Sequence, residues 1–232
     1  PEKIISFIKE NLNLNLPLSS KKVLITAGPT QEKIDNVRYI SNYSSGKMGI
    51  ALAKVAAELG ANVKLILGPT NHSIIHSNIE IVNVLSADHM YDRVLANFSS
   101  TDIIICAAAV SDFKPKNPVK NKIKKETGFD KIELVPNKDI LLEISKKKST
   151  SQILIGFALE SDNEINNAIS KLKNKNLDFV VLNSTNDKDA GFSVDTNKIT
   201  IIDSDSNIEE FKLKSKYNVS KDIFNKILKI KK

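Results

Sequence analysis

The residues most able to do chemistry in this chain lie close together between residues 23 and 49. An apolar run ends there at a Gly-Pro turn, and the polar segment that follows carries Asp35, Arg38 and Asn42. A Ser-Ser-Gly-Lys-x-Gly segment, residues 44–49, then opens a helix-like stretch rich in small apolar residues. Backbone N–H groups at a helix N-terminus attract anions. This pattern therefore predicts a phosphate-binding turn with a surplus of polar side chains beside it.

The glycines of this segment, Gly46 and Gly49, do not match a standard nucleotide motif. The dinucleotide fingerprint begins with a glycine that is missing here, and no acidic residue ends the second predicted strand to hold a ribose. The P-loop pattern fails because Met48 stands where that motif needs Ser or Thr. The two glycines therefore indicate either a phosphate-facing turn or tight packing of a helix on a strand.

Two further segments carry charged groups suited to a nucleotide. The run at 107–113 changes from small residues to the carboxylate of Asp112, which could bind a metal or ribose hydroxyls, or only cap a helix or turn. The Lys-Ile-Lys-Lys run of residues 122–125 is either a solvated face or a flap that neutralises phosphate charge. The net charge of +7 suits an anionic partner, either nucleic acid or a phosphorylated small molecule.

Other kinds of site have little support. His72 and His76 have i,i+4 spacing, but no third ligand accompanies them, which argues against zinc. Cys106 lies in an apolar run without an evident base, which argues against a catalytic thiol. Sparse aromatic residues that do not interleave with the basic runs argue against a nucleic-acid partner. A single cysteine, no signal peptide and no apolar run of membrane-spanning length together predict a cytoplasmic protein with no membrane partner.

Strand-like and helix-like segments alternate from residue 21 onward. Most strand-like runs are continuously apolar, as expected for strands covered on both faces, so the pattern predicts an α/β fold with a doubly wound, mainly parallel sheet. Ser86 and Ser161 are the predicted N-caps, and Gly60 is predicted to end the first helix. The predicted strands are 23–27, 62–67, 79–85, 102–108, 153–158 and 179–182, and the predicted helices are about 47–59, 87–98, 138–148 and 162–175.

Two inserts interrupt this alternation. Residues 113–137 are rich in Lys, Pro and Asn and include a short predicted strand at 131–135, and residues 191–213 hold two β runs, 198–203 and 208–213. Inserts of this length are often functional flaps. Ligands of doubly wound sheets bind beyond the carboxyl ends of the strands. One crevice is therefore expected among residues 28–30, 68–70, 109–113, 157–160 and Asn183.

Together these residues resemble one family, the phosphopantothenoylcysteine synthetase domain of the bacterial bifunctional phosphopantothenoylcysteine decarboxylase/phosphopantothenate–cysteine ligase. The resemblance covers residues 21–232 as one domain with a Rossmann-like fold and inserted β flaps. Residues 1–20, a short amphipathic helix and a Leu/Asn-rich stretch, resemble the interdomain linker. The motifs that carry the resemblance lie at 25–49, 107–113, 122–125, 137–140, 155–160, 171–178 and 191–202.

The resemblance implies a two-step ligase reaction in coenzyme A biosynthesis. The carboxylate of 4′-phosphopantothenate attacks the α-phosphate of CTP with Mg²⁺, which releases pyrophosphate and forms an acyl-cytidylate. The amine of L-cysteine then attacks the acyl carbon and displaces CMP, which gives 4′-phosphopantothenoylcysteine. The resemblance also implies a homodimer in which a β flap reaches towards the neighbour's site. A fused N-terminal decarboxylase domain would carry FMN.

The resemblance further implies roles for single residues. Asn42 would hold the acyl-cytidylate, and Lys122 would contact the nucleotide and assist activation, so these two are the candidate catalytic residues. Asp112 would bind the nucleotide and is the candidate Mg²⁺ ligand. The substrate-binding candidates are Asp35, Arg38, Asn42 and Ala109. The nucleotide-binding candidates are Ser44, Ser45, Gly46, Gly49, Ala108, Ala109, Asp112, Lys122, Asn137, Lys138, Asp139, Ile140, Phe157, Lys171 and Lys175.

Two positions depart from the family pattern, because Asn36 and Lys138 replace prolines. Losing a proline frees φ and leaves each loop less pre-organised, whereas Lys138 adds a cation near the nucleotide. Two other functions stay open on the sequence. One is a Rossmann-type NAD(P)-dependent oxidoreductase, which shares the βαβ plan. The other is a non-catalytic basic module that binds RNA or a partner protein.

Overall fold

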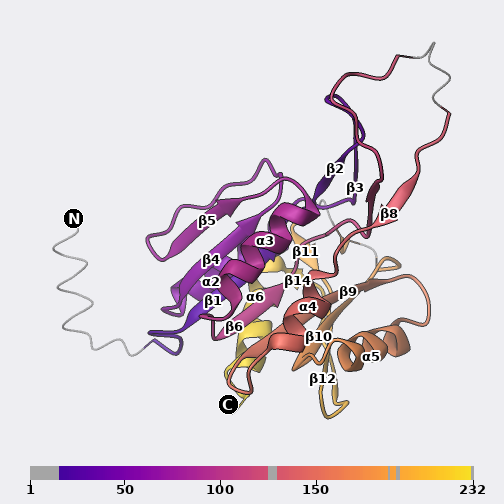
Figure 1. Cartoon of the computed structure of the whole chain (residues 1–232). Helices are drawn as coiled ribbons and strands as arrows, with labels where there is room; N and C mark the ends of the chain where they lie inside the picture. Colours follow the sequence, from indigo (N-terminus) through magenta and orange to yellow (C-terminus); the bar gives the residue numbers. More distant parts are fainter. Residues whose placement is uncertain (1–15, 125–129, 188, 192–193, 231–232) are drawn as a thin grey trace.

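The computed structural model describes residues 16–124, 130–187, 189–191 and 194–230. Within these ranges the chain forms an eight-stranded sheet with helices on both faces (Figure 1). Six strands are parallel, and two antiparallel strands extend one edge. The order across the sheet is β13 (Ile208–Glu210), β12 (Thr200–Asp203), β10 (Phe179–Ser184), β9 (Ile153–Glu160), β6 (Ile103–Cys106), β1 (Lys22–Ala27), β4 (Asn62–Leu67) and β5 (Ile79–Asn83).

The strand order reverses between β1 and β6. From β1 the chain moves outward through β4 to β5, and from β6 it moves the other way through β9 to β10. Loops leaving β1 and β6 therefore turn to opposite sides and leave a crevice between them, which is where doubly wound sheets bind their ligands. The predicted doubly wound, mainly parallel fold is confirmed.

Side chains of the strands alternate between two apolar clusters. On one face, Val23 and Ile25 pack with α2 (Lys47–Glu58) and α6 (Lys216–Ile227). On the other face, Leu24 packs with α3 (Ala87–Phe98), α4 (Ile140–Lys147) and α5 (Glu164–Asn174). Each such aliphatic side chain stabilises the fold by about 1.5–3 kcal/mol when fully buried. This burial on both faces explains why the strands read as continuous apolar runs.

Helix boundaries agree with the sequence in two cases and differ in two. Ser86 caps α3, because its Oγ accepts a hydrogen bond from the His89 N–H at 3.3 Å. Gly60 follows the end of α2 with φ of +95°, as its type predicts. The prediction for Ser161 was wrong, since α5 begins at Glu164 after Asn163, which has φ of 44°. Helix α6 was not among the predicted helices, although its buried residues have helical spacing.

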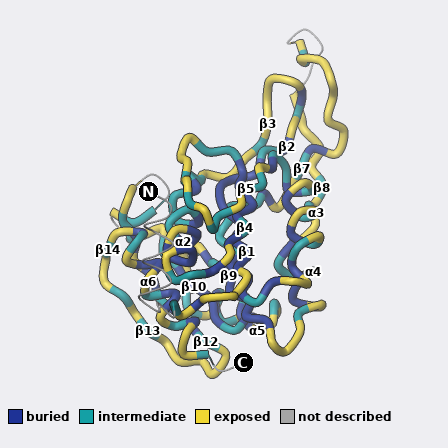
Figure 2. Tube along the Cα trace, turned by 90° about the vertical axis from the view of Figure 1, so that its left-hand side faces the viewer, coloured by how far each residue is buried: buried dark blue, intermediate teal, exposed yellow. Residues whose placement is uncertain are grey.

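The polar segment after β1 was expected to be a loop, but it forms a hairpin of β2 (Gln31–Lys33) and β3 (Tyr39–Ser41). Beside it, the first insert folds back on itself as β7 (Phe113–Pro115) and β8 (Leu134–Pro136), so the predicted strand at 131–135 lies a few residues further along. Residues 31–41, 113–124 and 130–136 together make a projection that we call the arm. Figures 1 and 2 show it standing away from the sheet, with mostly exposed residues towards its tip.

The second insert lies at the other side of the molecule. Its two β runs become β12 and β13, which pair antiparallel, so this prediction is confirmed with shorter strands. Before and after them, β11 (Thr196–Asn197) pairs with β14 (Lys214–Ser215) directly ahead of α6. Helix α6 is therefore anchored at its first turn to the start of the insert.

The predicted linker, residues 1–20, lies mostly outside the described residues. Its last part, 16–20, forms a turn on the end of α2, where the Leu18 N–H donates to the Leu59 carbonyl at 2.9 Å and the Leu18 side chain is buried. A domain start at residue 21 stays a prediction. Among the helices that the structure describes, none is long and apolar enough to cross a membrane.

Candidate functional site

Two adjoining cavities open at the carboxyl ends of the strands. The larger has a volume of about 520 Å³ and the smaller about 280 Å³. They share Ala108, Val110, Asp112, Phe157 and Lys171 as lining residues. The predicted crevice is confirmed for residues 109–112, 157–159 and Asn183, whereas residues 28–30 and 68–70 line neither cavity.

The wall between the cavities is built where the strand order reverses. Residues 107–112 leave β6 and run beside the chain leaving β1, joined by a parallel bridge between Pro29 and Ala109. The hydroxyls of two threonines hold this loop: Thr26 accepts from the Ala108 N–H at 3.3 Å, and Thr30 accepts from the Ser111 N–H at 3.0 Å. The small side chains here leave the backbone open to a ligand.

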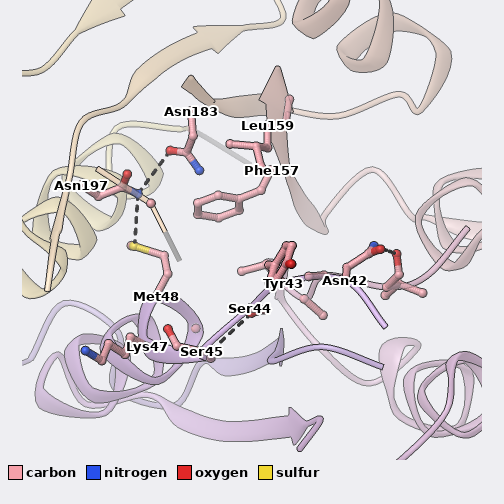
Figure 3. A pocket seen from close by; sticks show the side chains of 18 of the residues that line it. Asn42, Tyr43, Ser44, Ser45, Lys47, Met48, Phe157, Leu159, Asn183 and Asn197 are labelled. Atoms are coloured by element: carbon pink, nitrogen blue, oxygen red, sulfur yellow. Dashed lines mark hydrogen bonds between the residues drawn. The ribbon is translucent and has the colours of Figure 1, made fainter. Parts of the chain in front are cut away.

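The floor of the larger cavity is the N-terminus of α2. Gly46 precedes the helix with φ of +76°, a conformation that glycine adopts without strain, and its N–H lies 3.3 Å from the Ser44 hydroxyl. Thr70 fixes the turn from the other side by donating to the Ser45 carbonyl at 2.7 Å. Ser44, Ser45 and Lys47 all line the cavity (Figure 3). The first-turn N–H groups of a helix lack intrahelical partners, so an anion fits here.

Gly49 serves a different purpose from Gly46. A Cβ atom at Gly49 would lie 2.3 Å from the Ala27 Cβ, so this glycine allows α2 to pack directly on β1. The sequence left open whether the two glycines serve a turn or helix–strand packing. Gly46 makes the turn and Gly49 makes the packing, although both line the cavity.

The opposite wall comes from the far half of the sheet. Asn183 at the end of β10 accepts a hydrogen bond from Asn197 at 3.2 Å, and the same Asn197 amide lies 3.8 Å from the Met48 sulfur (Figure 3). Phe157 and Leu159 of β9 also face the cavity (Figure 3). Asn183 was predicted as a crevice residue, whereas Asn197 was not. Its motif gave no sign of its place, because β11 pairs with β14, which lies 17 to 19 residues further along the chain.

Lys216 is the second lining residue that sequence reasoning missed. Its Nζ donates to the carbonyls of Gly191, Val194 and Thr196 at 2.9, 2.5 and 2.9 Å. Burial, together with the nearby charge of Lys47, lowers the pKa of Lys216 to about 8. A lysine on a helix surface is normally exposed, so its type gave no signal. Here it holds the chain ahead of Asn197 against the cavity.

The smaller cavity collects the nucleotide-binding candidates from 137 to 140, together with Lys171 and Lys175 of the α5 end. Lys175 forms an ion pair with Asp139, whose other oxygen caps α4 by accepting from the Leu142 N–H at 2.8 Å. The pKa of Lys171 is lowered by burial, so its charge lies in a poorly solvated place. Cations and apolar side chains therefore line one slot.

Two side chains shape the entrance of this slot. The Asn137 amide donates to the Ser111 carbonyl at 2.8 Å and ties the slot to the central loop. Lys138, which replaces the family's proline, lies 4.5 Å from the centre of the Tyr91 ring. A cation over an aromatic ring is held there by the ring's charge distribution. This contact gives the loop a restraint where the proline is missing.

Three of the predicted site residues lie elsewhere. Asp35, Arg38 and Lys122 line neither cavity, because they belong to the arm. Asn42, in contrast, lies at the mouth of the larger cavity, where its amide donates to the Val110 carbonyl at 2.9 Å (Figure 3). The remaining candidates, Ser44, Ser45, Gly46, Gly49, Ala108, Ala109, Asp112, Asn137, Lys138, Asp139, Ile140, Phe157, Lys171 and Lys175, each line one cavity or both.

Two kinds of chemistry fit this site poorly. Burial raises the pKa of the Cys106 thiol to about 12, so this side chain does not supply a thiolate at neutral pH. His76 accepts a hydrogen bond from the Asn78 N–H at 3.1 Å, and no group of three or more metal-binding His, Cys, Asp or Glu side chains occurs among the described residues. Asp112 remains a carboxylate exposed at the junction of the cavities.

Comparison with known proteins shows what the chain is similar to. The family described as the DNA/pantothenate metabolism flavoprotein C-terminal domain matches residues 18–230. A protein named cysteine/cysteine sulfinic acid decarboxylase, from an unknown prokaryotic organism, is 50% identical over 226 residues, which cover 97% of this chain and 63% of that protein. The coenzyme A biosynthesis bifunctional protein CoaBC of Bacillus subtilis (strain 168) is 42% identical over 234 residues, which cover 100% of this chain and 57% of that protein.

A solved structure is also similar over nearly its whole length. The crystal structure of the C-terminal domain of a coenzyme A biosynthesis bifunctional protein CoaBC matches with a TM-score of 0.78 and 38% sequence identity. That match covers 92% of this chain and 97% of the domain. The chain spans 63% and 57% of the length of the two curated relatives above, so it corresponds to part of each.

Proposed function

Because this chain belongs to the family of DNA/pantothenate metabolism flavoprotein C-terminal domains, we propose that it is a phosphopantothenate–cysteine ligase of coenzyme A biosynthesis. It activates 4′-phosphopantothenate with CTP and then joins the acyl group to L-cysteine. One relative is named as a coenzyme A biosynthesis bifunctional protein, which supports a place for this chain in coenzyme A biosynthesis. The nucleotide and the two acyl-transfer steps rest on the resemblance described above.

The observation that carries this proposal is the pair of joined cavities. One is floored by a helix N-terminus and suits phosphate groups, and the other is a smaller slot lined by apolar side chains, polar side chains and three lysines, which suits a nucleoside. They meet at Asp112, Phe157 and Lys171. A reaction that joins a nucleotide to a second anionic substrate needs two such spaces with a common wall.

In the first step, a carboxylate oxygen of 4′-phosphopantothenate forms a bond to the α-phosphorus of CTP, and the bond to the β-phosphate oxygen breaks. Both reactants are anionic, so the protein must neutralise charge and align them. The N-terminus of α2 lines the larger cavity, and Lys171 belongs to the wall that both cavities share, so both supply positive potential there. Pyrophosphate leaves and the acyl-cytidylate stays.

In the second step, the cysteine nitrogen bonds to the acyl carbon and loses a proton, while the bond from that carbon to the CMP oxygen breaks. Asn42 lies at the cavity mouth with its amide oriented by the Val110 carbonyl. This position supports a role in holding the acyl group during the attack. An amide suits this purpose because it adds no charge beside the anionic intermediate.

Asp112 fits a Mg²⁺ ion that arrives with the nucleotide. Mg²⁺ in such sites is held by one or two carboxylates together with phosphate oxygens, so a dedicated cluster of protein ligands is not required. The Asp112 carboxylate lies at the junction of the two cavities, where phosphates would meet it. When bound, Mg²⁺ would neutralise phosphate charge in the activation step.

Lys122 acts, in this proposal, on the site of a second copy of the chain. It lies on the arm rather than in its own cavities. The arm also exposes apolar side chains, including Val37 at 58%, Tyr39 at 52% and Phe113 at 52% of their surface. Exposed apolar groups gathered on one projection suit burial against another chain. A homodimer would thus hide this surface and complete each site with the partner's lysine.

The rest of the longer protein is inferred from the relatives alone. The FMN-dependent decarboxylase of the resemblance would belong to the part of such a protein that this chain does not span. A cytoplasmic location likewise stays a prediction. Neither affects the chemistry of the two cavities.

Pyrophosphate release tests the proposal directly. The chain is incubated with phosphopantothenate and CTP, ATP, GTP or UTP, and L-cysteine is added afterwards. We expect pyrophosphate with CTP, and amide product only after cysteine is present. Saturable NAD(P)H binding without pyrophosphate release would instead favour the oxidoreductase, and RNA binding that CTP does not compete would favour the basic module.

A further inference from the structure

Asp35 is the most heavily hydrogen-bonded carboxylate of the arm. Its Oδ1 accepts from the backbone N–H groups of Val37 and Arg38, both at 2.8 Å. Its Oδ2 accepts from Arg38 Nε at 3.0 Å, from Arg38 Nη2 at 2.5 Å and from the Ile123 N–H at 3.1 Å. The side chain has no exposed surface. A carboxylate offers about four lone-pair positions, so five donors leave Asp35 no capacity for a substrate or a metal.

Asp35 and Arg38 both hydrogen-bond to the main chain of Ile123. Asp35 accepts the Ile123 N–H, and Arg38 Nη2 donates to the Ile123 carbonyl at 2.9 Å. A further bond from the Val119 N–H to the Ile34 carbonyl, at 3.0 Å, joins the same two segments. The hairpin tip therefore fixes the main chain of a segment that is 88 residues away in sequence.

Lys122 directly precedes Ile123 and has an exposed side chain. Lysine is a long, flexible side chain, so holding its main chain in place lowers the entropy cost of bringing its ammonium group to a phosphate. We propose that Asp35 is a positioning residue that, together with Arg38, fixes the main chain at Ile123 and so presents Lys122 to the nucleotide. This inference rests on the proposed function for the role of Lys122, but not for the clamp itself.

Electrostatics agree with the geometry. The hydrogen bond from the Arg38 side chain, with those from the backbone, holds the pKa of Asp35 well below its usual range. Arg38 donates from Nε and Nη2 to one carboxylate oxygen, and Nη2 also donates to the Ile123 carbonyl, an arrangement that a lysine cannot reproduce. The clamp therefore needs both residue types. The substrate-binding role that the sequence implied for Asp35 has no free acceptor to support it.

A double-mutant cycle tests the positioning role. Asp35→Asn should lower the rate of pyrophosphate release by on the order of tenfold to a hundredfold, with little change in KM for phosphopantothenate. Arg38→Lys should do the same more weakly. If Asp35 acts through Lys122, then Asp35→Asn combined with Lys122→Gln should be no slower than Lys122→Gln alone. Multiplied effects, or a raised KM for phosphopantothenate with unchanged kcat, would overturn the proposal.

Hydrogen exchange at the Ile123 amide tests the clamp without any activity. We expect faster exchange in Asp35→Asn than in wild type, with an unchanged melting temperature because the arm stands apart from the core. Lys120→Gln is the matched control, since it removes an exposed cation from the same segment. Equal exchange in Asp35→Asn and wild type would refute the clamp. A wild-type chain that releases no pyrophosphate would refute the proposed function while this measurement still decides the clamp.

Discussion

Gly49 packs so tightly on β1 that a Cβ atom at this position would come within 2.3 Å of the Ala27 Cβ and 3.1 Å of the Ala27 Cα. This contact brings the N-terminus of α2 to the point where the strand order reverses. The phosphate-facing turn can lie this close to the end of β1 only because Gly49 has no Cβ atom. A larger residue must push the helix outward.

Gly49→Ala should therefore both destabilise the fold and weaken nucleotide binding. Overpacking at a close contact costs about 1–3 kcal/mol, which corresponds to a fall in melting temperature of about 2–12 °C for a chain of this size. Calorimetry and a nucleotide titration measure the two effects. Lys54→Ala, on the exposed face of the same helix, is the control and should leave both nearly unchanged. Unaltered nucleotide affinity in Gly49→Ala would show that the packing of Gly49 on β1 is not needed for nucleotide binding.

Asn42→Asp should uncouple the two steps of the reaction. A carboxylate cannot donate to the Val110 carbonyl, so the side chain loses the bond that orients it and adds negative charge beside the intermediate. We expect acyl-cytidylate to accumulate while amide formation slows by about a hundredfold. Quenched-flow analysis of pyrophosphate, intermediate and product measures this. Asn36→Asp, in the exposed hairpin tip, makes the same chemical change as a control; normal turnover by Asn42→Asp would contradict the assigned role.

Mixing two strongly impaired variants, Asn42→Asp and Lys122→Gln, should restore activity if Lys122 serves the partner's site. A heterodimer of Asn42→Asp and Lys122→Gln chains has one site with both native residues, supplied by different chains. Random exchange of subunits in a two-fold dimer then recovers about a quarter of wild-type activity. A chain that supplies its own lysine would give no recovery at all. Sedimentation of each preparation checks that dimers are present.

The affinity for nucleotide should fall as the pH rises above about 8. Lys216 has a pKa of about 8 in the folded chain, and its ammonium group donates to three carbonyls. A neutral amine has only two N–H groups, so deprotonation releases one carbonyl of the chain that leads to Asn197. We expect KM for the nucleotide to rise between pH 7 and 9 in wild type. In Lys216→Met it should already be high and independent of pH.

The free energy of unfolding should rise with pH through the titration of Lys216, whereas the affinity for nucleotide should fall. The two measurements therefore distinguish an effect on stability from an effect on binding. Its folded pKa lies below the usual value of 10.5, so between about pH 8 and 10.5 the unfolded chain binds the extra proton. This group therefore adds to the free energy of unfolding as the pH rises through that window. Lys221→Met, an exposed lysine of the same helix, is the control for both measurements. A fall in KM above pH 8 would exclude the proposed role of the ammonium group.

Much of the fold could be read from local patterns. Six strand-like runs, most of them continuously apolar, predicted the six parallel strands, and Ser86 and Gly60 marked helix ends, because burial and capping depend on residues within a few positions of each other. Ser161 is not the cap, because α5 begins at Glu164 after Asn163, which adopts a left-handed conformation. The hairpin at residues 31–41 was missed because each of its strands has only 3 residues.

The sequence by itself determined which residues can do chemistry and that most of them follow parallel strands. Only the tertiary structure decided how they divide. It gathered Asn42, Asp112 and Lys171 around two joined cavities, and it placed Lys122 on the arm. In the folded chain, hydrogen bonds occupy both carboxylate oxygens of Asp35. The Lys216 ammonium group is hydrogen-bonded to three backbone carbonyls. These outcomes depend on contacts between distant parts of the chain, such as Asp35 with Ile123 across 88 residues. A side chain's type determines which groups it can bind, whereas its neighbours in the fold determine which of its donors and acceptors remain available to a ligand.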